Sequence, residues 1–555
     1  MKKNIFNIGK ILMMRERIIT AIVYALTIFT QCVLFHYLTY KEILFSTLWH
    51  SPVDFLRFYL PAATEAVFFA GFVFLFKNKW WTVVVSLLIN TWILANLWYF
   101  RANGIFVDHY AVGMIGNLNG FWNSILALIR PVDFVFVGLT AFLAGILFIL
   151  RKRESEKQPQ IFLATISLAL VMGLANGGLL VKKYKGDWSF INPMKKLIFH
   201  YVEDYSIIRV FFMTIKDYTL MMEEEKYILT DQEKSKADLF INPNSSVKNR
   251  DRKLIVCIIE SFNSFVITKK FMPNLYHFID TCNHMLSCDK IITQTKGGGS
   301  SDGLLIIETG LLPLSRGATC YRFSFNTYPA ISHIFDNNTI ILPHALHVYN
   351  QARMNIAYGI NNCLADQSDD DKELFKTTIQ QLACSDYVIP LTISTHIPCQ
   401  KYADSSNLSI PDTNPSLLSN YIKCANVLDK GIKILLDSIA SNEYLQKATI
   451  IFTGDHCLPV PVDETFDNAY NYSRFIPLII YSPEIKQKTI VADTCYQMDI
   501  YPTILHLIGC EDYYWKGFGV NLLDSVARHN RPITPEEAYE LSDKMIRADY
   551  FSNFK

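Results

Sequence analysis

The chain has 555 residues, of which 50% are hydrophobic and only 19% are charged, and its mean hydropathy is positive at +0.17. This composition argues against an entirely soluble protein and predicts that part of the chain lies in lipid, while the length predicts more than one domain. The formal net charge of +1 argues against a binder of polyanions, so we expect no nucleic-acid partner.

The apolar residues are concentrated before residue 182, in five stretches that are each long enough to span a bilayer as a helix, which takes about 20 residues. These stretches cover residues 18–38, 56–76, 80–100, 131–150 and 160–181. The third contains TVVVSLLINTWILANLWYF, which is apolar nearly all round, whereas a buried helix of a soluble protein keeps a polar face. We therefore predict a multi-pass α-helical membrane domain with five spans over residues 1–182.

Basic residues in the short loops predict how this domain is oriented. They occur in the N-terminal arm, between the second and third stretches (Lys77 and Lys79), and between the fourth and fifth (151–157). Loops rich in Lys and Arg stay in the cytoplasm, and an odd number of spans then exports the rest of the chain. We expect a protein of the inner (plasma) membrane in which everything after about residue 182 lies on the extracytoplasmic side.

Residues 183–250 connect this domain to the exported part. The first portion mixes aromatic, basic and apolar residues, which is typical of amphipathic helices on the outer membrane surface and equally of helices that pack beside a membrane domain. Residues 230–253 are polar and rich in turn-forming residues, so they are predicted to be a linker.

Beyond residue 251 the pattern changes to short runs rich in branched residues, which are typical of strands buried on both faces of a parallel sheet. The runs are KLIVCIIE (253–260), YVIPLTIST (387–395), ATIIFTGD (448–455) and FIPLIIYS (475–482). Helical patterns such as residues 417–441 lie between them. Residues 251–555 are therefore predicted to form an α/β domain with a mostly parallel central sheet.

Ionisable residues end three of these predicted strands. Glu260 ends the first, His396 follows the second, and Asp455 and His456 end the third. Because the carboxyl ends of parallel strands meet at one edge of a sheet, we expect these side chains to converge. Carboxylates and an imidazole together suit Mn²⁺, Mg²⁺ or Zn²⁺. Taken singly, each residue has an ordinary structural explanation, such as a turn.

The stretch QTKGGGSSDGLL (294–305) allows two interpretations. A glycine- and serine-rich segment can be a flexible linker. Alternatively, 289–295 is a strand, the glycines form a tight turn, and Ser300 or Ser301 begins a helix, whose N-terminus binds phosphate-like anions. A serine there needs activation to attack at neutral pH, and a coordinated metal provides it. Simple helix capping by the serines remains a third explanation.

Seven motifs in this order resemble the sulfatase-like branch of the alkaline phosphatase superfamily, and more narrowly its lipoteichoic acid synthase and phosphoglycerol transferase group. They are IVCIIESFNSF, MPNLYHFI, GGGSSDG, TISTHIP, FTGDH, RFIPLIIYSP and MDIYPTILHLIG…GFGVNLL, and they cover roughly residues 250–525. The five preceding spans also match the plan of that group. The resemblance implies a sulfatase-like catalytic domain after the membrane domain.

Carried over by motif, the resemblance implies a site for one divalent metal, Mn²⁺ first and Mg²⁺ or Zn²⁺ as alternatives. The implied metal ligands are Glu260, Ser300, Asp455 and His456. Ser300 is also the implied nucleophile, in a position where lipoteichoic acid synthases usually have threonine, and His396 would contact the phosphoryl group or the leaving oxygen. The substrate-binding residues Arg353 and Tyr349 are carried over only by their place in HVYNQARMNIAYG, since the family's tryptophan is absent and the spacing differs.

The implied reaction moves a phospholipid headgroup, phosphoglycerol or phosphoethanolamine, through a phosphoseryl intermediate to a cell-envelope glycan or glycolipid. A metal-dependent phosphodiesterase or phosphatase on the same residues is an alternative. Sulfuric ester hydrolysis is disfavoured, because SSDGL (300–304) lacks the proline and arginine of the C/S-x-P-x-R motif of sulfatases. An inactive membrane scaffold and a transporter are the remaining alternatives.

The chain has 12 cysteines, eleven of them beyond residue 250. The Gram-positive enzymes of the group generally lack cysteine, so this difference indicates a periplasm-facing relative and makes lipoteichoic acid itself doubtful as the product. In an oxidising compartment some of these cysteines can pair, and Cys282 and Cys288 are close enough in sequence to do so. Others, such as Cys257 and Cys424, have the pattern of buried apolar positions.

Overall fold

The computed structural model describes residues 2–43, 52–103, 106–107, 126, 128–150, 157–183, 206–221, 227–243, 245, 252–315, 317–365, 370–397, 399–410, 416–458 and 471–554. The chain forms two compact units. One comprises Met1–His109 and Ile125–Glu224, and the other is built on Glu225–Lys555.

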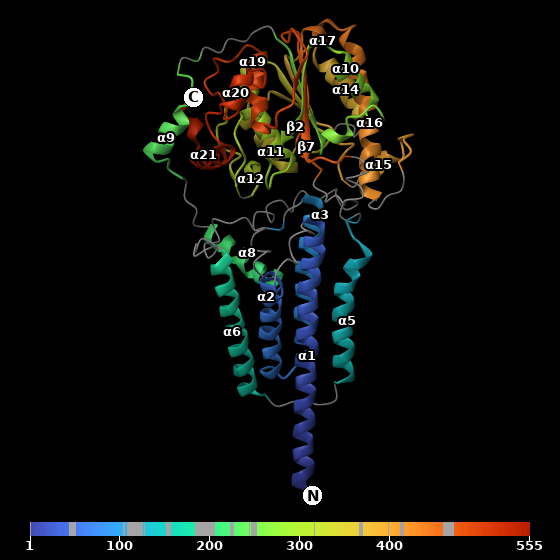
Figure 1. Ribbon diagram of the computed structural model, residues 1–555, viewed down its shortest axis with the longest axis vertical. Coiled ribbons are helices and arrows are strands. Elements are labelled where there is room, and N and C mark those ends of the chain that lie inside the picture. The colour runs from blue at the N-terminus through green and yellow to red at the C-terminus, as the bar shows by residue number, and fades with distance from the viewer. Residues whose placement is uncertain are drawn as a thin grey trace. The chain divides into compact units, whose positions relative to one another are not determined.

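The N-terminal unit is a helical bundle (Figure 1). Its helices are α1 (Lys2–Ile43), α2 (Pro52–Gly71), α3 (Trp81–Asn103), α5 (Phe134–Ile149), α6 (Pro159–Lys183) and α8 (Ile207–Met221). Four described segments are long and apolar enough to cross a membrane, namely Met14–Thr39, Trp81–Arg101, Pro131–Ile149 and Pro159–Lys182. The predicted second span corresponds to a shorter apolar helix, Tyr59–Phe74. Apolar helices thus occupy all five predicted positions, and four of them reach a full spanning length.

Polar contacts at one end of the bundle show that these helices alternate in direction. Arg17, near the start of the apolar part of α1, donates to the carbonyl of Phe74 at the end of the second apolar segment (2.7 Å). The amide of Gln158, directly before α6, donates to the same carbonyl (2.8 Å). Lys79, directly before α3, donates to the carbonyl of Leu150 at the end of α5 (3.3 Å). The starts of α1, α3 and α6 therefore lie beside the ends of α2 and α5. The last carbonyl groups of a helix have no hydrogen-bond donor within that helix, and the buried guanidinium of Arg17 supplies one to the second apolar segment.

Polar side chains also connect the helices inside the bundle. Gln31 of α1 donates to Asn90 of α3 (2.7 Å) and to Thr140 of α5 (3.2 Å), and Asn90 donates to Thr140 (2.9 Å). Such interhelical hydrogen bonds hold membrane helices together because lipid offers these groups no alternative partner.

Helix α8 belongs to the segment for which the sequence left two interpretations. It contacts α1 and α3. The indole of Trp92 donates to the carbonyl of Ile207 (2.9 Å), and its ring lies edge-on to Phe211 at 5.2 Å. These contacts favour a helix that packs on the bundle. Residues 184–205 of the same segment, and the basic residues 151–156, lie outside the described residues.

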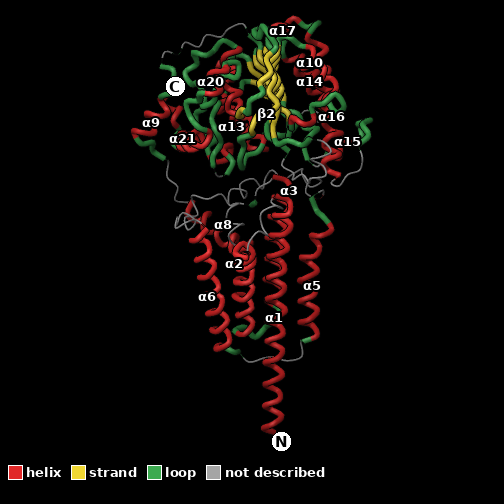
Figure 2. Tube along the Cα trace, viewed as in Figure 1, coloured by secondary structure: helices red, strands yellow, loops and turns green. Residues whose placement is uncertain are grey.

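The second unit is an α/β domain with a nine-stranded mixed sheet in the order β4-β3-β5-β1-β6-β7-β2-β8, and β9 pairs with β2. The strands are β1 (Leu254–Ile259), β2 (Met285–Ile292), β3 (Asn338–Ile341), β4 (Asn362–Leu364), β5 (Tyr387–Pro390), β6 (Thr449–Gly454), β7 (Phe475–Tyr481), β8 (Thr489–Val491) and β9 (Cys495–Tyr496). The strands lie between two groups of helices (Figure 2). Both faces of β1 and β6 are consequently buried, as their uninterrupted apolar runs predict.

The helices of this unit form two layers (Figure 1). One layer includes α11 and α19, which contact each other, and the other includes α10, α14 and α16, in which α16 contacts both α10 and α14. The helices are α9 (Asp231–Asp238), α10 (Pro273–Thr281), α11 (Ser300–Thr309), α12 (Thr319–Arg322), α13 (Gln351–Tyr358), α14 (Asp371–Gln381), α15 (Gln400–Ala403), α16 (Ser416–Ile439), α17 (Glu443–Lys447), α19 (Ile500–Leu507), α20 (Ser525–His529) and α21 (Pro535–Arg547).

Two local features differ from the sequence prediction. Strand β7 runs antiparallel to both β6 and β2, although its branched residues resemble those of the parallel strands. The predicted linker over 230–253 is wrong for residues 231–238, which form α9. A reciprocal capping box between Thr230 and Glu233 begins this helix, and Glu233 pairs with Lys544 of α21 (3.0 Å).

Candidate active site

The candidate site lies at one edge of the sheet, beyond the ends of β1, β6 and β2. Strands β1 and β6 are parallel, and β7 is antiparallel to both β6 and β2, so β2 runs in the same direction as β1 and β6. The carboxyl ends of all three strands therefore meet at one edge. Glu260 follows β1, Asp455 and His456 follow β6, and Ser300 follows β2 after a seven-residue connection. Glu260, Asp455 and His456 are thus placed where the buried strands β1 and β6 end, and Ser300 is placed by the connection that follows β2.

The glycine-rich stretch is a strand–turn–helix connection and not a linker. Gly299, with φ +52°, immediately precedes α11, and Ser300 is the first residue of this helix. The turn is closed by Asp302, whose carboxylate accepts hydrogen bonds from the amides of Lys296 and Gly298 (both 2.9 Å). A Cβ on Gly298 would lie 2.2 Å from this carboxylate, so only glycine fits there.

The hydroxyl of Ser300 is directed at the ionisable residues and not at the helix backbone. It donates to Glu260 Oε2 at 3.0 Å and lies 3.4 Å from His456 Nε2. The residue at the N-cap, Gly299, makes no side-chain capping bond. The neighbouring hydroxyl of Ser301 turns back to the carbonyl of Gly298 (2.8 Å). Of the two candidate serines, Ser300 is thus the one whose hydroxyl faces the ionisable cluster, and it makes this contact instead of a capping bond.

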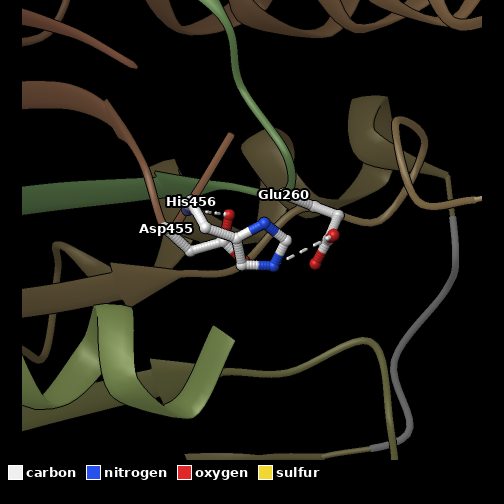
Figure 3. A group of neighbouring side chains, drawn as sticks. All are labelled: Glu260, Asp455 and His456. Carbon is white, nitrogen blue, oxygen red and sulfur yellow. Dashed lines mark hydrogen bonds and ion pairs between the residues drawn. The ribbon is translucent and has the colours of Figure 1, made fainter. Parts of the chain in front are cut away.

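Glu260, Asp455 and His456 converge on one point (Figure 3). Their nearest ligand atoms all lie within 4.8 Å of one another. His456 Nε2 is 3.8 Å from Glu260 Oε1 and 3.5 Å from Asp455 Oδ2. Glu260 is 8% and Asp455 1% exposed, so water does not screen these charges effectively.

Local hydrogen bonds fix the orientation of each of these side chains. His456 Nδ1 lies 2.9 Å from the carbonyl of Cys457. A carbonyl only accepts, so Nδ1 carries the proton and Nε2 presents its lone pair to the site. Asp455 Oδ1 accepts from the amides of Ser261 (2.8 Å) and His456 (2.6 Å), which leaves Oδ2 facing Nε2. Ser261 also donates to Glu260 Oε1 (2.7 Å).

The protonation states of this cluster are shifted by burial and by mutual charge. Burial alone would raise the pKa of Glu260, but the charges of His396 and His456 lower it, to about 2. Burial and the nearby Glu260 carboxylate raise the pKa of Asp455, to about 7. For His456, burial lowers the pKa but the two carboxylates outweigh it, and the net shift is upward. Two buried carboxylates facing one imidazole attract a cation, and a bound cation would keep both carboxylates ionised.

These residues fit a divalent metal ion by donor type as well as by distance. Two carboxylates, one imidazole nitrogen with its lone pair exposed and one hydroxyl make a mixed oxygen and nitrogen set. The donors come from three separate strand ends, so they surround a point in space and do not line up along a single element. The set is compatible with Mn²⁺, Mg²⁺ or Zn²⁺ and does not select among them.

Of the three further predicted residues, His396 and Tyr349 lie beside the cluster. His396 is close enough for its charge to act on Glu260, and its Nδ1 lies 2.6 Å from the carbonyl of Ile397. A Cβ built on Gly299 would lie 3.7 Å from the hydroxyl of Tyr349, which places this hydroxyl at the turn before Ser300. Tyr349 has φ +52°, a strained conformation for a large residue and one that is often found at functional sites.

Arg353 is placed differently. It lies on α13, is exposed, and stacks its guanidinium on the ring of Phe325 at 4.2 Å. Among the described contacts, none joins its guanidinium to Glu260, Ser300, Asp455 or His456. The structure therefore brings six of the seven predicted residues together and leaves Arg353 apart from them.

Two supporting residues escaped the sequence analysis. Gln497 donates to the carbonyl of Asp455 (2.7 Å) and accepts from the amide of Gln294 (3.0 Å), so it links the metal-site loop to the strand that leads to Ser300. Gly303 lies against Asp455, because a Cβ there would be 2.6 Å from the Asp455 carbonyl oxygen. Both contacts join residues far apart in the chain, and neither residue type marks a site in a sequence.

Comparisons with known families agree with this architecture. The sulfatase family model matches residues 313–510, and the model of the lipoteichoic acid synthase N-terminal domain matches residues 1–189. The α/β unit therefore contains a region that matches the sulfatase family, and the helical unit matches the N-terminal domain of lipoteichoic acid synthases. The sulfatase match begins after Glu260 and Ser300, so the assignment of these two residues rests on their motifs and geometry.

Individual relatives are distant but cover most of the chain. Lipoteichoic acid synthase 2 of Bacillus subtilis is 23% identical over 542 residues, covering 87% of this chain and 80% of the relative. Lipoteichoic acid synthase of Staphylococcus saprophyticus is 22% identical over 527 residues, covering 81% and 76%. The solved lipooligosaccharide phosphoethanolamine transferase A of Neisseria meningitidis is 13% identical with a TM-score of 0.50, covering 88% of this chain and 95% of that protein. This last likeness concerns the fold alone.

Proposed function

We propose that this sulfatase-like protein is a metal-dependent, membrane-anchored phosphotransferase. It would move a phospholipid headgroup, phosphoglycerol or phosphoethanolamine, to a cell-envelope glycan or glycolipid. The observation that supports this best is the position of Ser300. Its hydroxyl lies at the N-terminus of α11, 3.0 Å from Glu260 and 3.4 Å from the lone-pair nitrogen of His456. Relatives of the chain include lipoteichoic acid synthases and a phosphoethanolamine transferase by name.

In this proposal Glu260, Asp455, His456 and Ser300 hold one divalent metal, for which Mn²⁺ is our first expectation and Mg²⁺ or Zn²⁺ the alternatives. When bound, the metal lowers the pKa of the serine hydroxyl and offsets negative charge on the phosphate. The deprotonated Oγ of Ser300 attacks the phosphorus of the lipid phosphodiester, the bond to the diacylglycerol oxygen breaks, and the headgroup phosphate stays on Ser300. The positive end of the α11 dipole favours this bound phosphate.

His396 and Tyr349 would act on the substrate. The Nε2 of His396 donates a proton to the leaving diacylglycerol oxygen, and in the second step accepts one from the hydroxyl of the acceptor. The hydroxyl of Tyr349, beside the Gly299 turn, hydrogen-bonds to the phosphate or the headgroup. Attack by the acceptor on the phosphoserine then returns Ser300 to its starting state.

We further propose that the protein lies in the inner membrane with its catalytic domain on the periplasmic side. The alternating directions of the five apolar helices support an odd number of crossings, provided that the short Tyr59–Phe74 helix also crosses. The basic residues Arg17, Lys77 and Lys79 lie at the end of the bundle that would face the cytoplasm. A chain with four crossings would instead leave both ends on one side.

Reconstituted protein distinguishes this proposal from its alternatives. The full chain is placed in vesicles containing phosphatidylglycerol or phosphatidylethanolamine labelled in the headgroup, with Mn²⁺, and diacylglycerol is measured. We expect diacylglycerol release from one of the lipids by wild type and none by Ser300→Ala. A matching amount of free headgroup phosphate without an acceptor would indicate a phosphodiesterase. An aryl sulfate tests the sulfuric ester alternative, and no turnover of any substrate by metal-loaded protein would favour an inactive scaffold.

A further inference from the structure

Two cysteines that are distant in the chain lie together in the sheet of the catalytic domain. Cys288 lies on β2, and Cys495 begins β9, which pairs in parallel with β2 at Ile291. Both thiols reach the same acceptor, the carbonyl oxygen of Asp493, with sulfur–oxygen distances of 3.7 and 3.6 Å. Each thiol also shifts the pKa of the other, as expected for neighbouring groups. This arrangement replaces the pairing of Cys282 with Cys288 that proximity in sequence favours.

The geometry places the two thiols side by side, and their contact acts on them in opposite directions. It lowers the pKa of Cys288 and raises that of Cys495. The thiolate is the attacking species in thiol–disulfide exchange, so Cys288 would react first and Cys495 would resolve the intermediate.

In a second pair of neighbouring thiols, Cys399 and Cys424, the contact does not lower the pKa of Cys399. The contact with Cys424 and burial raise the pKa of Cys399 well above its usual range. The thiol of Cys424 donates to the backbone carbonyl of Cys399 itself at 3.0 Å, whereas Cys288 and Cys495 share the carbonyl of a third residue. This pair therefore serves as an internal comparison for the first.

We propose that Cys288 and Cys495 form an intramolecular disulfide in the exported protein. The proposal rests on the periplasmic location proposed above, because structural disulfides persist in oxidising compartments. The oxidant is a disulfide compound, such as an exported thiol–disulfide oxidoreductase or oxidised glutathione. The Cys288 thiolate attacks one of its sulfurs and displaces the other as a thiol. Cys495 then attacks Cys288 in the mixed disulfide and displaces the second thiol. The protein loses two protons and two electrons, and the oxidant gains them.

The bond would tie together the two segments that support the active site. Strand β2 continues through Gln294 to the glycine turn and Ser300, while β9 continues to Gln497, which holds the carbonyl of Asp455 (2.7 Å). Gln294 and Gln497 are already hydrogen-bonded (3.0 Å). A covalent link between residues about 200 apart also restricts the unfolded chain strongly, so reduction should lower the melting temperature by about 5 °C.

The test uses purified full-length protein equilibrated with oxidised and reduced glutathione, alkylated, and digested without reduction. Cleavage after Leu286 separates Cys282 from Cys288, so mass spectrometry can identify the partner of each. We expect a peptide that links Cys288 to Cys495, and a melting temperature that falls by about 5 °C on reduction. Cys495→Ala should abolish this sensitivity to reductant, whereas Cys384→Ala, at an exposed position, should retain it.

Alkylation of both Cys288 and Cys495 after equilibration with oxidised glutathione would overturn the pairing, and so would a link from Cys288 to Cys282. These readouts use no lipid substrate, so they are independent of the proposed transferase activity. Protein alkylated directly in cells adds a separate result. If purified protein forms the bond readily but the cellular protein is fully reduced, the pairing is correct and the exported location is wrong.

Discussion

Gly303 should control metal binding although it offers no ligand atom. A Cβ at this position would lie 2.6, 2.8 and 2.9 Å from the carbonyl oxygen, Cα and Cβ of Asp455. Carbon atoms in contact prefer about 3.5 Å or more, so in Gly303→Ala α11 and Asp455 must separate by roughly 0.7 Å. Asp455 is held from its other sides by Ser261, His456 and Gln497, so the separation shifts Asp455 relative to Ser300. Overpacking of this kind costs about 1–3 kcal/mol.

The assay is calorimetric titration of Mn²⁺ into chelator-treated full-length protein in detergent. We expect Gly303→Ala to bind Mn²⁺ about 10–100-fold more weakly, the loss typical of displaced residues that support a metal ligand. Gly431→Ala is the matched control, because it is also helical but its Cβ would find its nearest atoms at 3.2 Å. Both variants gain helix propensity, so a difference between them is steric. Affinity for Mn²⁺ that is equal in Gly303→Ala, Gly431→Ala and wild type would refute this reasoning.

Two further predictions concern substrate binding and pH. Tyr349→Phe should raise the KM for lipid about 10-fold or more, because it removes a hydrogen bond to a charged phosphate. Arg353→Ala should change this KM less than about 2-fold. Steady-state diacylglycerol release measures both values, and a larger effect of Arg353→Ala would show that Arg353 is the substrate ligand. Burial raises the pKa of Asp371 to about 6. The protonated Asp371 side chain therefore contributes its full share to the free energy of unfolding below about pH 4, and this contribution, about 3 kcal/mol, is lost as the pH rises through 6. Asp371→Asn should remove that part of the pH dependence of thermal unfolding, whereas the control Asp437→Asn, at an exposed position, should keep it. If the melting temperature of Asp371→Asn changes with pH in parallel with that of wild type, the prediction is wrong.

The parts of the fold that could be predicted are those encoded over short distances. Buried strands appear as runs of branched residues, and a polar residue directly after such a run lies at the sheet edge, which is why the convergence of Glu260, Asp455 and His456 could be predicted. The glycine turn before Ser300 is equally local. The direction of β7 is not, because an antiparallel strand buried on both faces has the same composition as a parallel one.

The remaining features depend on contacts between distant residues. Gln497 contacts Asp455 across 42 positions, and Cys288 meets Cys495 across about 200, so no periodicity or spacing announces either pair. Helix α9 was missed for another reason, since its polar composition hid the capping box of Thr230 and Glu233, a signal that the sequence does contain. The shorter second apolar helix, Tyr59–Phe74, ends where the buried Arg17 donates to the carbonyls of Val73 and Phe74, which are 56 and 57 positions away in the chain.

The central claim is that Ser300 forms a covalent bond to the phosphate of a lipid headgroup. Mass spectrometry of protein incubated with Mn²⁺ and labelled phosphatidylglycerol or phosphatidylethanolamine, without an acceptor, tests it most directly. We predict a headgroup-phosphate adduct on the peptide that contains Ser300, absent from Ser300→Ala, with one equivalent of diacylglycerol released. Turnover of the lipid by metal-loaded protein with the label on another residue, or retained by Ser300→Ala, would contradict the account.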